Sequence, residues 1–261
     1  MQPGKGTSIV QLSDTVVIVT GGGMGIGKTY AEALARNGAT VVVADIVTDA
    51  ADRVADALRA EGFDALGLHV DVTDEGSTRA MVATAVERYG KVDVLLNNAA
   101  LYSGILPKKF FDDISVDEWD RVMTVNTRGV FLCIKAVFPH MKARSRGKII
   151  NISSATALSG APGFVHYVAS KAAVLGMTRS FARELGQFGI TVNAIAPGLT
   201  ASDTTQALVP DDDSQRQVQA RALKRVELPD DIVGAVLFLA GPGSDFVTGQ
   251  TLVVDGGGIM H

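Results

Sequence analysis

The chain has 261 residues, of which 47% are hydrophobic and 20% charged, a balance that predicts a globular protein and excludes a disordered one. Its net charge of −4 and its scattered Lys and Arg residues give no indication of a nucleic-acid partner. Its one cysteine, Cys133, excludes an intrachain disulfide and favours a reducing, cytoplasmic location, and we expect neither a secretory leader nor an apolar run of membrane-spanning length.

Short β-branched segments alternate with longer segments of helical periodicity, a pattern typical of βαβ units around a parallel sheet. The predicted strands are 16–20, 40–46, 65–72, 92–98, 148–153, 190–196 and 250–256. The predicted helices are 25–37, 48–61, 74–89, 115–144, 163–187 and 229–240. With right-handed crossovers, these elements predict an α/β fold. We expect a single Rossmann-type, doubly wound domain over residues 1–261, whose seven-stranded parallel sheet is flanked by helices on both faces.

A glycine-rich segment, TGGGMGIG at 20–27, directly follows the first strand and opens the first helix. Glycines at such a turn let the backbone approach a pyrophosphate, and the helix N-terminus supplies N–H donors and partial positive charge. The strand-turn-helix context therefore predicts a dinucleotide site. The residues expected to contact the cofactor here are Gly21, Gly23, Met24, Gly25, Ile26 and Gly27.

An acidic residue, Asp45, ends the second strand 18 residues after Gly27. An acid about 20 residues beyond such a glycine motif binds the hydroxyls of the adenosine ribose. The 2′-phosphate of NADP would meet like charge at this point, and the next residues, 46–48, offer no cation. Asp45, with Ile46 beside it, therefore predicts NAD as the cofactor. The alternative is that Asp45 only caps the following helix.

Further polar motifs lie at or beyond the ends of the later strands. In chain order they are Asp71-Val72, NNAA at 97–100, Asn126 in VMTVNTRGVF, the serine pair 153–154, YVASK at 167–171 and PGLTAS at 197–202. The polar stretch 199–227 lies between the sixth strand and the last helix. We interpret it as a mobile substrate lid that contains a short helix.

The glycine spacing and these motifs resemble the classical branch of the short-chain dehydrogenase/reductase family, from Val16 to the end of DGGG at 258. The resemblance implies an NAD-dependent oxidoreductase that interconverts a secondary alcohol and a ketone. It implies a catalytic tetrad of Asn126, Ser154, Tyr167 and Lys171. The separation of 13 residues between serine and tyrosine selects Ser154, and Ser153 is expected to point into the sheet.

The resemblance also assigns the remaining cofactor contacts and an assembly. Ala100 stands where the family has glycine, and Ser202 where it usually has threonine. The family usually forms homotetramers through the helices that correspond to 115–144 and 163–187. The residues expected to touch the cofactor by resemblance are Asp71, Val72, Asn98, Ala99, Tyr167, Lys171, Pro197, Gly198, Thr200 and Ser202.

The expected chemistry is general acid–base catalysis by a helical pair. Tyr167 and Lys171 are four residues apart, so both side chains project from one helix face. A free tyrosine has a pKa of about 10, but a nearby ammonium and the positive nicotinamide ring favour its phenolate. Ser154 would donate a hydrogen bond to the substrate oxygen. By resemblance, Asn126 would hold a water that links Lys171 to solvent.

The expected substrate pocket is mostly apolar, with no Lys or Arg placed to grip a carboxylate or phosphate. It favours an uncharged, aromatic or cyclic secondary alcohol or ketone. The four histidines show no ligand spacing, so no catalytic metal is expected, and His166 is interpreted as a satisfied structural histidine. Two alternatives remain open: a 3-oxoacyl-(acyl-carrier-protein) reductase-like enzyme, and a non-catalytic dinucleotide-binding sensor. The predicted substrate contacts are Leu101, Ser154, Thr156, Phe164, Tyr167 and Leu199.

Overall fold

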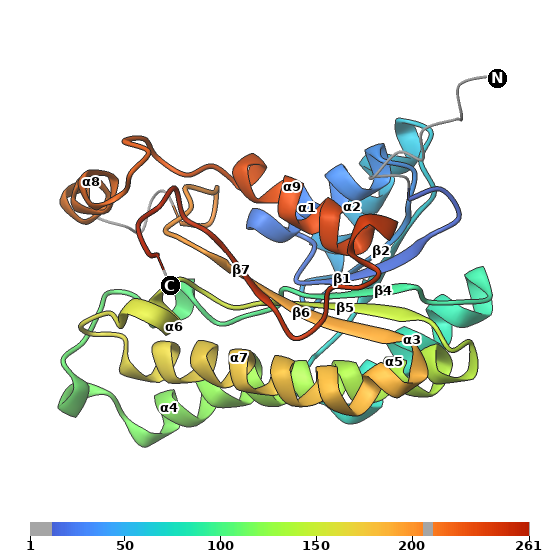
Figure 1. Ribbon diagram of the computed structural model, residues 1–261, viewed down its shortest axis with the longest axis horizontal. Coiled ribbons are helices and arrows are strands. Elements are labelled where there is room, and N and C mark those ends of the chain that lie inside the picture. The colour runs from blue at the N-terminus through green and yellow to red at the C-terminus, as the bar shows by residue number, and fades with distance from the viewer. Residues whose placement is uncertain (1–11, 206–210, 261) are drawn as a thin grey trace.

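The computed structural model describes residues 12–205 and 211–260. In this part of the chain, parallel strands form one seven-stranded sheet in the order β3-β2-β1-β4-β5-β6-β7 (Figure 1). The predicted seven-stranded parallel sheet, flanked by helices on both faces, is therefore confirmed. The strands are β1 Val16–Thr20, β2 Thr40–Asp45, β3 Ala65–His69, β4 Val94–Asn97, β5 Gly147–Ile152, β6 Ile190–Pro197 and β7 Thr251–Val254.

Two layers of helices enclose the sheet, with α1, α2 and α9 on one face and α3, α5 and α7 on the other (Figure 1). The helices are α1 Gly25–Arg36, α2 Thr48–Ala60, α3 Glu75–Tyr89, α4 Val116–Met123, α5 Gly129–Ala143, α6 Thr156–Ser159, α7 Val165–Leu185, α8 Asp211–Ala220 and α9 Pro229–Ala240. Short 3₁₀ turns lie at η1 Ser103–Ile105, η2 Phe111–Asp113, η4 Gly186–Phe188 and η5 Pro242–Ser244.

The core is split by the sheet into two hydrophobic clusters. Successive side chains of a strand point to opposite faces. Val17 and Val19 of β1 accordingly pack in one cluster with Leu34 of α1, whereas Ile18 packs in the other with Val130 of α5. Because helices cover both faces, both sets of strand residues are buried. This explains why the strands are almost continuously apolar in sequence.

The position of the site follows from the strand order. β1 pairs with β2 on one side and with β4 on the other, so the winding of the chain reverses between β1 and β4. In such sheets a crevice forms at the carboxyl ends of the strands beside this reversal. The glycine-rich segment leaves β1 there, and Asp45 ends β2 at the same edge.

The long helix predicted over 115–144 is not one regular helix. It comprises α4, a π-helical turn η3 Thr124–Arg128, and α5. Asn126 lies in the π-helical turn, where its Oδ1 accepts a hydrogen bond from the Leu101 N–H at 2.7 Å. Such turns insert one residue into a helix and are frequent at functional sites. Hydrophobic periodicity does not reveal an insertion of one residue.

The segment predicted to be a lid contains α8, the short helix expected there. Its two ends are held together, because Thr200 pairs with Glu227 as a parallel bridge and the Ala201 N–H donates to the Glu227 carbonyl at 2.8 Å. Residues 206–210 of this segment lie outside the described residues. In Figure 1, α8 lies at the edge of the molecule, beyond the carboxyl ends of the strands.

One helix, Val116–Ala143, is long and apolar enough to cross a membrane by length and composition alone. A single helix that meets this criterion among the described residues is weak evidence for a membrane span, so it does not overturn the expectation of none. Half of its most apolar stretch is buried within the fold, and α5 packs on α3 and on the sheet. A core helix meets the same criterion, so this helix is explained by its place in the fold.

Candidate active site

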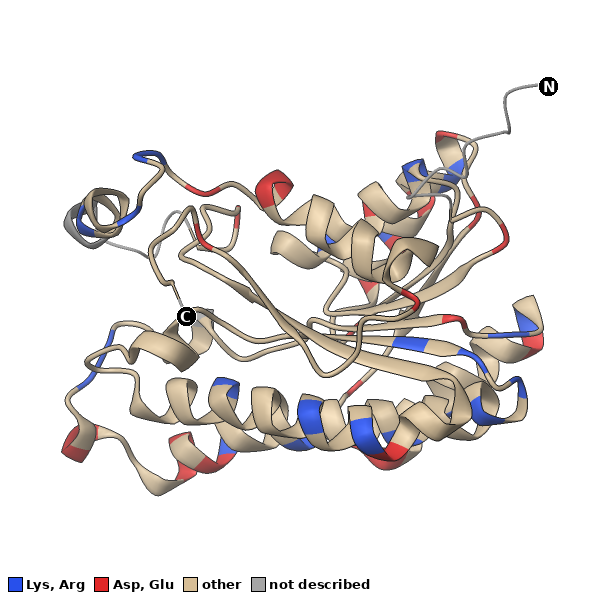
Figure 2. Ribbon diagram, in the orientation of Figure 1, with Lys and Arg blue, Asp and Glu red and all other residues tan. Residues whose placement is uncertain are grey.

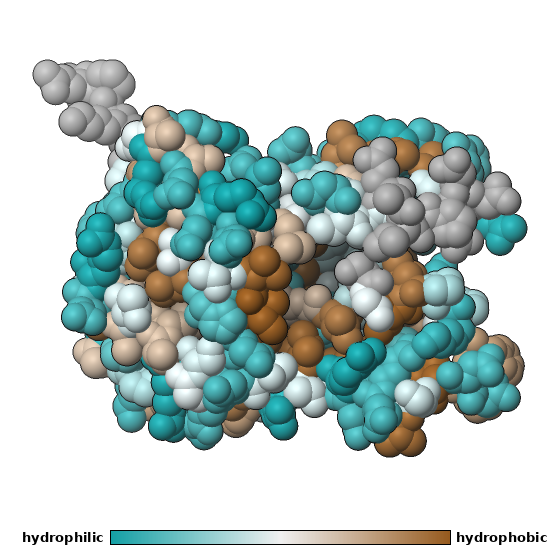
Figure 3. All heavy atoms as spheres, turned by 180° about the vertical axis from the view of Figure 1, so that it is seen from behind, coloured by the Kyte–Doolittle hydropathy of each residue, from teal (hydrophilic) through white to brown (hydrophobic). Residues whose placement is uncertain are grey.

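A cavity of about 1290 Å³ lies at the carboxyl ends of the strands. Figure 3 shows the surface hollowed there, with hydrophobic residues around the opening. Nearly all the predicted cofactor and substrate residues line it; the exceptions are Gly23 and the tetrad residue Asn126. The predicted residues in the lining are Gly21, Met24, Gly25, Ile26, Gly27, Asp45, Ile46, Asp71, Val72, Asn98, Ala99, Leu101, Ser154, Thr156, Phe164, Tyr167, Lys171, Pro197, Gly198, Leu199, Thr200 and Ser202.

The glycine-rich segment brings bare backbone to the cavity wall. Gly21 has a φ of 63°, and a Cβ there would lie 2.9 Å from the Ala99 Cα. A Cβ on Gly27 would lie 2.1 Å from the Gly21 carbonyl oxygen, so neither position tolerates a side chain. α1 begins at Gly25, and its N-cap residue Met24 provides no side-chain cap. The first-turn N–H groups therefore remain available for an anion.

The Asp45 carboxylate is fixed at the cavity wall. Its Oδ2 accepts from the Gly23 N–H at 2.9 Å, and its Oδ1 accepts from the Val47 N–H at 3.0 Å. Gly23 therefore orients Asp45 rather than lining the cavity. The N-cap residue of α2 is Val47, so the structure does not use Asp45 as the helix cap. Each carboxylate oxygen has further lone pairs with which to accept hydroxyl donors.

Two other polar residues shape the same wall. Asp71 accepts from the Thr73 N–H at 2.8 Å and from its hydroxyl at 2.7 Å, and these bonds lower the pKa of the Asp71 carboxyl. The Asn98 side-chain amide donates to the carbonyls of Thr20 and Gly21, at 3.1 and 3.0 Å. Asn98 therefore braces the glycine-rich segment against the end of β4.

Three of the four tetrad residues meet at one point of the cavity. Tyr167 and Lys171 lie on α7, and Ser154 follows β5. The Lys171 Nζ lies 5.7 Å from the centre of the Tyr167 ring and donates to the Ile152 carbonyl at 2.8 Å. The hydroxyl of the neighbouring Ser153 instead donates to the Lys171 carbonyl at 2.8 Å, so it faces the backbone of α7.

The electrostatics of the pair differ from the expectation. Burial raises the pKa of Tyr167 above its ordinary value, the nearby Tyr102 raises it further, and a hydrogen bond with Ser154 lowers it. Burial also lowers the pKa of Lys171 to about 8. The protein groups alone therefore favour the neutral phenol, because desolvation outweighs the hydrogen bond with Ser154.

Asn126 is fully buried behind the cavity. Besides accepting from the Leu101 N–H, its side chain donates to the Ser170 hydroxyl at 3.1 Å. Ser170 in turn donates to the Tyr167 carbonyl at 2.7 Å. Asn126 thus ties the loop after β4 to the turn of α7 that carries Tyr167. The water-holding role implied by the family resemblance stays a prediction.

Three aromatic rings in mutual contact form one side of the cavity beside Ser154, and we call Tyr102, Phe164 and Tyr167 the aromatic wall. Ring centres lie 5.8 Å apart for Tyr102 and Phe164, 5.3 Å for Tyr102 and Tyr167, and 5.7 Å for Phe164 and Tyr167. Offset and edge-on contacts of this kind are favourable beyond the area that they bury. The wall presents flat apolar surface next to the predicted acid/base.

Cations also line the cavity, which corrects the expectation that no Lys or Arg is placed there. They are Lys108, Arg121 and Arg221. The Lys108 Nζ lies 5.7 Å above the Phe164 ring. These residues come from a loop, from α4 and from the end of the lid, so no motif spacing marks them. Among the described residues, no group of three or more His, Cys, Asp or Glu side chains could hold a metal ion.

A buried ion pair holds the base of the lid against the end of β6. The side chains of Arg221 and Glu227 are 5% and 4% exposed, with Nη2 and Oε2 3.2 Å apart. Arg221 also donates to the Leu199 carbonyl at 2.8 Å, and the Thr200 hydroxyl donates to Glu227 at 2.9 Å. A Cβ on Gly198 would lie 2.5 Å from the Glu227 carboxylate, so the pair requires glycine there.

Comparisons with known proteins agree on one family. A family model described as enoyl-(acyl carrier protein) reductase matches residues 21–258. The chain is 40% identical over 248 residues to cyclopentanol dehydrogenase of Comamonas testosteroni, covering 95% of this chain and 98% of that protein. It is 39% identical over 244 residues to a 3-oxoacyl-[acyl-carrier-protein] reductase of Staphylococcus aureus (strain N315), covering 93% and 97%.

Two further matches extend this likeness. The chain is 43% identical over 246 residues to an uncharacterized oxidoreductase of Mycobacterium tuberculosis (strain ATCC 25618 / H37Rv), covering 94% of this chain and 98% of that protein. The solved structure of a 7α-hydroxysteroid dehydrogenase complexed with NADH and 7-oxo glycochenodeoxycholic acid superposes with a TM-score of 0.91. That comparison covers 98% of each chain at 35% identity.

Proposed function

Because the chain belongs to the short-chain dehydrogenase/reductase family and is an oxidoreductase, we propose that it is an NAD-dependent dehydrogenase of secondary alcohols, with Tyr167 as acid/base. One observation carries the proposal: a single cavity is lined by the Asp45 carboxylate and by Ser154, Tyr167 and Lys171. A non-catalytic sensor would need Asp45 to bind the dinucleotide but would not need Ser154, Tyr167 and Lys171. Turnover is therefore the better explanation of the arrangement.

The residues present fit a nicotinamide dinucleotide. The uncapped first turn of α1 suits a pyrophosphate, and Asp45 suits a ribose diol. Asp71, Val72, Asn98 and Ala99 would hold the adenosine half, and the segment 197–202 would hold the nicotinamide half. NAD, when bound, supplies the hydride acceptor for the alcohol carbon.

The chain's own residues supply position and proton transfer. Tyr167 takes the proton of the alcohol hydroxyl, and Ser154 donates a hydrogen bond to the same oxygen. Lys171 holds the ribose hydroxyls of the nicotinamide half and keeps its ammonium close to the phenol. Charge on the bound nicotinamide adds to that of Lys171 in favouring the phenolate, which offsets part of the effect of burial.

A cyclic secondary alcohol is the substrate class that the site supports best. The aromatic wall offers flat apolar surface beside Tyr167. A cyclopentanol dehydrogenase and a hydroxysteroid dehydrogenase are among the similar proteins, and both names denote enzymes of ring alcohols. Lys108 and Arg121 at the cavity would tolerate an anionic group elsewhere on such a ring, whereas Arg221 is paired with Glu227.

We expect NADH formation from cyclopentanol or cyclohexanol, with kcat/KM for NAD at least about tenfold above that for NADP, since a like-charge contact disfavours the 2′-phosphate by several kcal/mol. The test is a panel of ring and open-chain secondary alcohols with each cofactor. Asp45→Ala should narrow the difference by removing the repulsion. Asp49→Ala, on the outer first turn of α2, is the matched control and should leave the ratio unchanged. An NADP preference of the unsubstituted enzyme would sink the Asp45 assignment.

The comparisons also favour a second candidate, a 3-oxoacyl-(acyl-carrier-protein) reductase, since one similar protein has that activity and the matching family model describes a related one. Such enzymes usually prefer NADPH and dock an acidic carrier on basic surface. Figure 2 shows both charge signs spread over the helices and loops of the described chain. Together with Asp45, this spread makes the reductase the weaker candidate. NADPH-dependent reduction of a 3-oxoacyl thioester would reverse the order.

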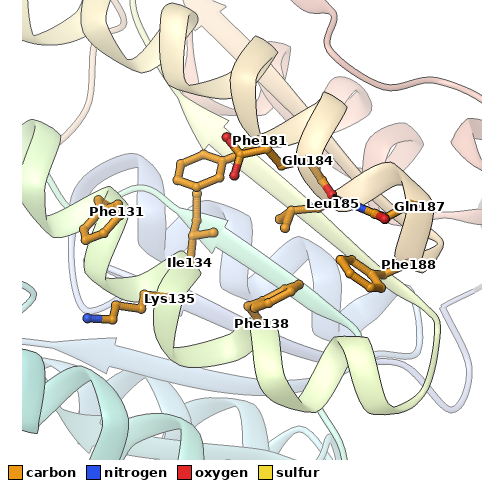
Figure 4. Close-up of a pocket in the computed structure, with 9 residues that line it drawn as sticks. All are labelled: Phe131, Ile134, Lys135, Phe138, Phe181, Glu184, Leu185, Gln187 and Phe188. Atoms are coloured by element: carbon orange, nitrogen blue, oxygen red, sulfur yellow. Dashed lines mark hydrogen bonds between the residues drawn. The ribbon is translucent and has the colours of Figure 1, made fainter.

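A second copy of the chain is the partner we propose, in a homotetramer. Four phenylalanines and two aliphatic side chains line an open apolar groove between α5 and α7 (Figure 4). Phe131 is 43% exposed and its ring centre lies 6.4 Å from that of Phe181. Exposed aromatic clusters of this kind mark protein interfaces.

We propose a reducing, cytoplasmic location for the protein. Its one cysteine, Cys133, is a buried free thiol, and burial raises its pKa to about 12.

Phe131→Glu is expected to shift the tetramer to smaller species, because it replaces an exposed apolar ring of the groove by a carboxylate that must lose its water when the groove is covered. Sedimentation velocity at micromolar concentration measures the change. Phe110→Glu is the matched control, since Phe110 is 68% exposed in the loop before η2 and lies outside the groove. A monomeric unsubstituted protein would refute the proposed assembly.

A further inference from the structure

A network of three side chains, two of them buried, lies behind the aromatic wall. Lys109, in the loop before η2, forms an ion pair with Glu118 of α4. The other oxygen of Glu118 lies 3.2 Å from the His166 Nε2 on α7. The side chains of Glu118 and His166 are 9% and 1% exposed. We call these residues the Lys109–Glu118–His166 network.

The two ring nitrogens of His166 differ in their hydrogen bonding. Lys109, and then His166, hold the pKa of the Glu118 carboxyl below its usual range, so the carboxylate only accepts. The His166 Nε2 must therefore carry a proton. The His166 Nδ1 is buried without a partner among the described residues, which corrects the expectation of a satisfied histidine.

Both ends of the network reach the aromatic wall. The His166 ring stacks on Phe164, with centres 6.3 Å apart and planes inclined by 24°. At the other end, the backbone N–H of Lys109 donates to the carbonyl of Gly163 at 3.2 Å. Gly163 directly precedes Phe164 in the chain. Phe164 is 3% exposed and in turn contacts Tyr167. The position of Phe164 is therefore set from behind by His166 and from the side by the loop of Lys109.

None of the three network residues lines the cavity, so none can touch the substrate. We propose that the Lys109–Glu118–His166 network is a positioning device that holds the aromatic wall against Tyr167 and thereby sets the preference of the site for ring-shaped alcohols and ketones. The inference rests on the proposed function in taking the cavity as the substrate site. A ring lying flat on the wall depends on the placement of Phe164. A short open chain at Ser154 and Tyr167 does not.

The test measures binding rather than turnover. In a Tyr167→Phe background that keeps the ring of residue 167, calorimetry gives the Kd of cyclohexanone and of butanone for the NADH complex. Glu118→Gln keeps the shape of the side chain and removes its charge. We expect the Kd of cyclohexanone to rise about fivefold, the scale of one aromatic contact. The Kd values of butanone and NADH should change less than about twofold, since neither depends on the aromatic contact.

Two substitutions of Lys109 test the same network should Glu118→Gln fold poorly. Lys109→Met should reproduce the selective loss, and Lys109→Arg should restore binding because it keeps the ion pair. Glu75→Gln is the matched control, since it breaks surface ion pairs of α3 with Arg79 at 2.6 Å and with Lys135 at 3.0 Å, away from the cavity. In the unsubstituted background, the same Lys109→Met change should raise KM for cyclohexanol with little change in kcat.

Three results would overturn the inference. The first is equal weakening of the binding of both ketones, and the second is a Lys109→Met variant that binds cyclohexanone as tightly as Lys109→Arg. The third is failure to bind cyclohexanone with the network intact. Failure of the proposed function is a different result. There, the unsubstituted enzyme would form no NADH from any alcohol of the panel, while cyclohexanone binding still responded to the network.

Discussion

Tyr167→Phe is expected to lower kcat/KM for alcohol oxidation by about 10²–10⁴-fold, the range of general acid–base catalysis. This corresponds to roughly 3–5 kcal/mol of lost transition-state stabilisation. The substitution removes one hydroxyl and keeps the ring, which packs 5.3 Å from Tyr102 and 5.7 Å from Phe164. Cofactor binding should survive, because the glycine-rich segment and Asp45 are untouched. Kinetics of oxidation and NADH fluorescence titrations measure the two effects separately.

The pH profile adds a second readout for the same variant. Burial raises the pKa of the Tyr167 hydroxyl, and oxidation needs the phenolate, so the rate should rise with pH. Lys171, with a pKa of about 8, loses its proton as the pH rises and then no longer favours the phenolate. The residual rate of Tyr167→Phe should lack the rise that belongs to the phenol.

Tyr30→Phe is the matched control for this experiment. Tyr30 is fully buried in α1, its hydroxyl has no hydrogen-bond partner among the described residues, and it does not line the cavity. Its loss should leave turnover unchanged. If the Tyr167→Phe enzyme binds NADH and retains more than about a tenth of the turnover, the loss of rate is smaller than acid–base catalysis predicts. The mechanism would then have to be abandoned.

Arg221→Met is expected to destabilise the fold by about 3–5 kcal/mol, the usual effect of removing one partner of a buried ion pair. The Glu227 carboxylate would keep its hydrogen bond from Thr200 but lose the only cation within ion-pair distance among the described residues. The Leu199 carbonyl would also lose a donor, since Arg221 binds it at 2.8 Å. Urea unfolding of the two proteins measures the difference in the free energy of unfolding.

This loss should depend on pH. Burial raises the pKa of Glu227 above its ordinary value, and Arg221 opposes that rise. Without Arg221 the pKa of the folded state rises further, so the folded protein binds the proton more tightly than the unfolded chain. Stability is then greatest below the unfolded pKa of about 4.3 and falls as pH increases through the folded value. The variant should therefore be less impaired at pH 5 than at pH 8.

Two comparisons isolate the buried pair. Adding Glu227→Gln to Arg221→Met should restore part of the stability, because no buried charge remains. Arg225→Met is the control, since Arg225 is 57% exposed and its pair with Asp231 at 2.6 Å is worth only about 0–1 kcal/mol as a surface ion pair. An Arg221→Met variant that is no less stable than Arg225→Met would contradict the importance of the buried pair.

The sequence predicts those parts of the site that depend on strand order alone. Parallel strands bring their carboxyl ends to one edge of the sheet, so motifs that follow the strands must meet. Asp45 at the end of β2 and Ser154 after β5 therefore line one cavity, as predicted. Tyr167 and Lys171 also meet there, because their spacing of four residues places both on one face of α7.

The remaining features depend on contacts between segments that no motif connects. The π-helical turn at Asn126 follows from its bonds to Leu101, 25 residues away in the chain. Glu118 and His166 are separated by 48 residues and meet only because α4 packs on α7. The pKa of Tyr167 could not be predicted either, because the desolvation that dominates it depends on packing rather than on spacing.

The bridge between Thr200 and Glu227 bears on how such enzymes diversify. Because Thr200, soon after β6, pairs with Glu227, just before α9, the segment between them is a closed excursion whose two ends lie side by side. Changing the length of a closed excursion adds little entropic penalty and leaves the sheet in register. Insertion, deletion or exchange within this excursion can therefore alter what reaches Tyr167 with little effect on folding, provided that Arg221 and its ion pair with Glu227 are kept. Grafting it between relatives is a route to new substrate ranges in one step of recombination.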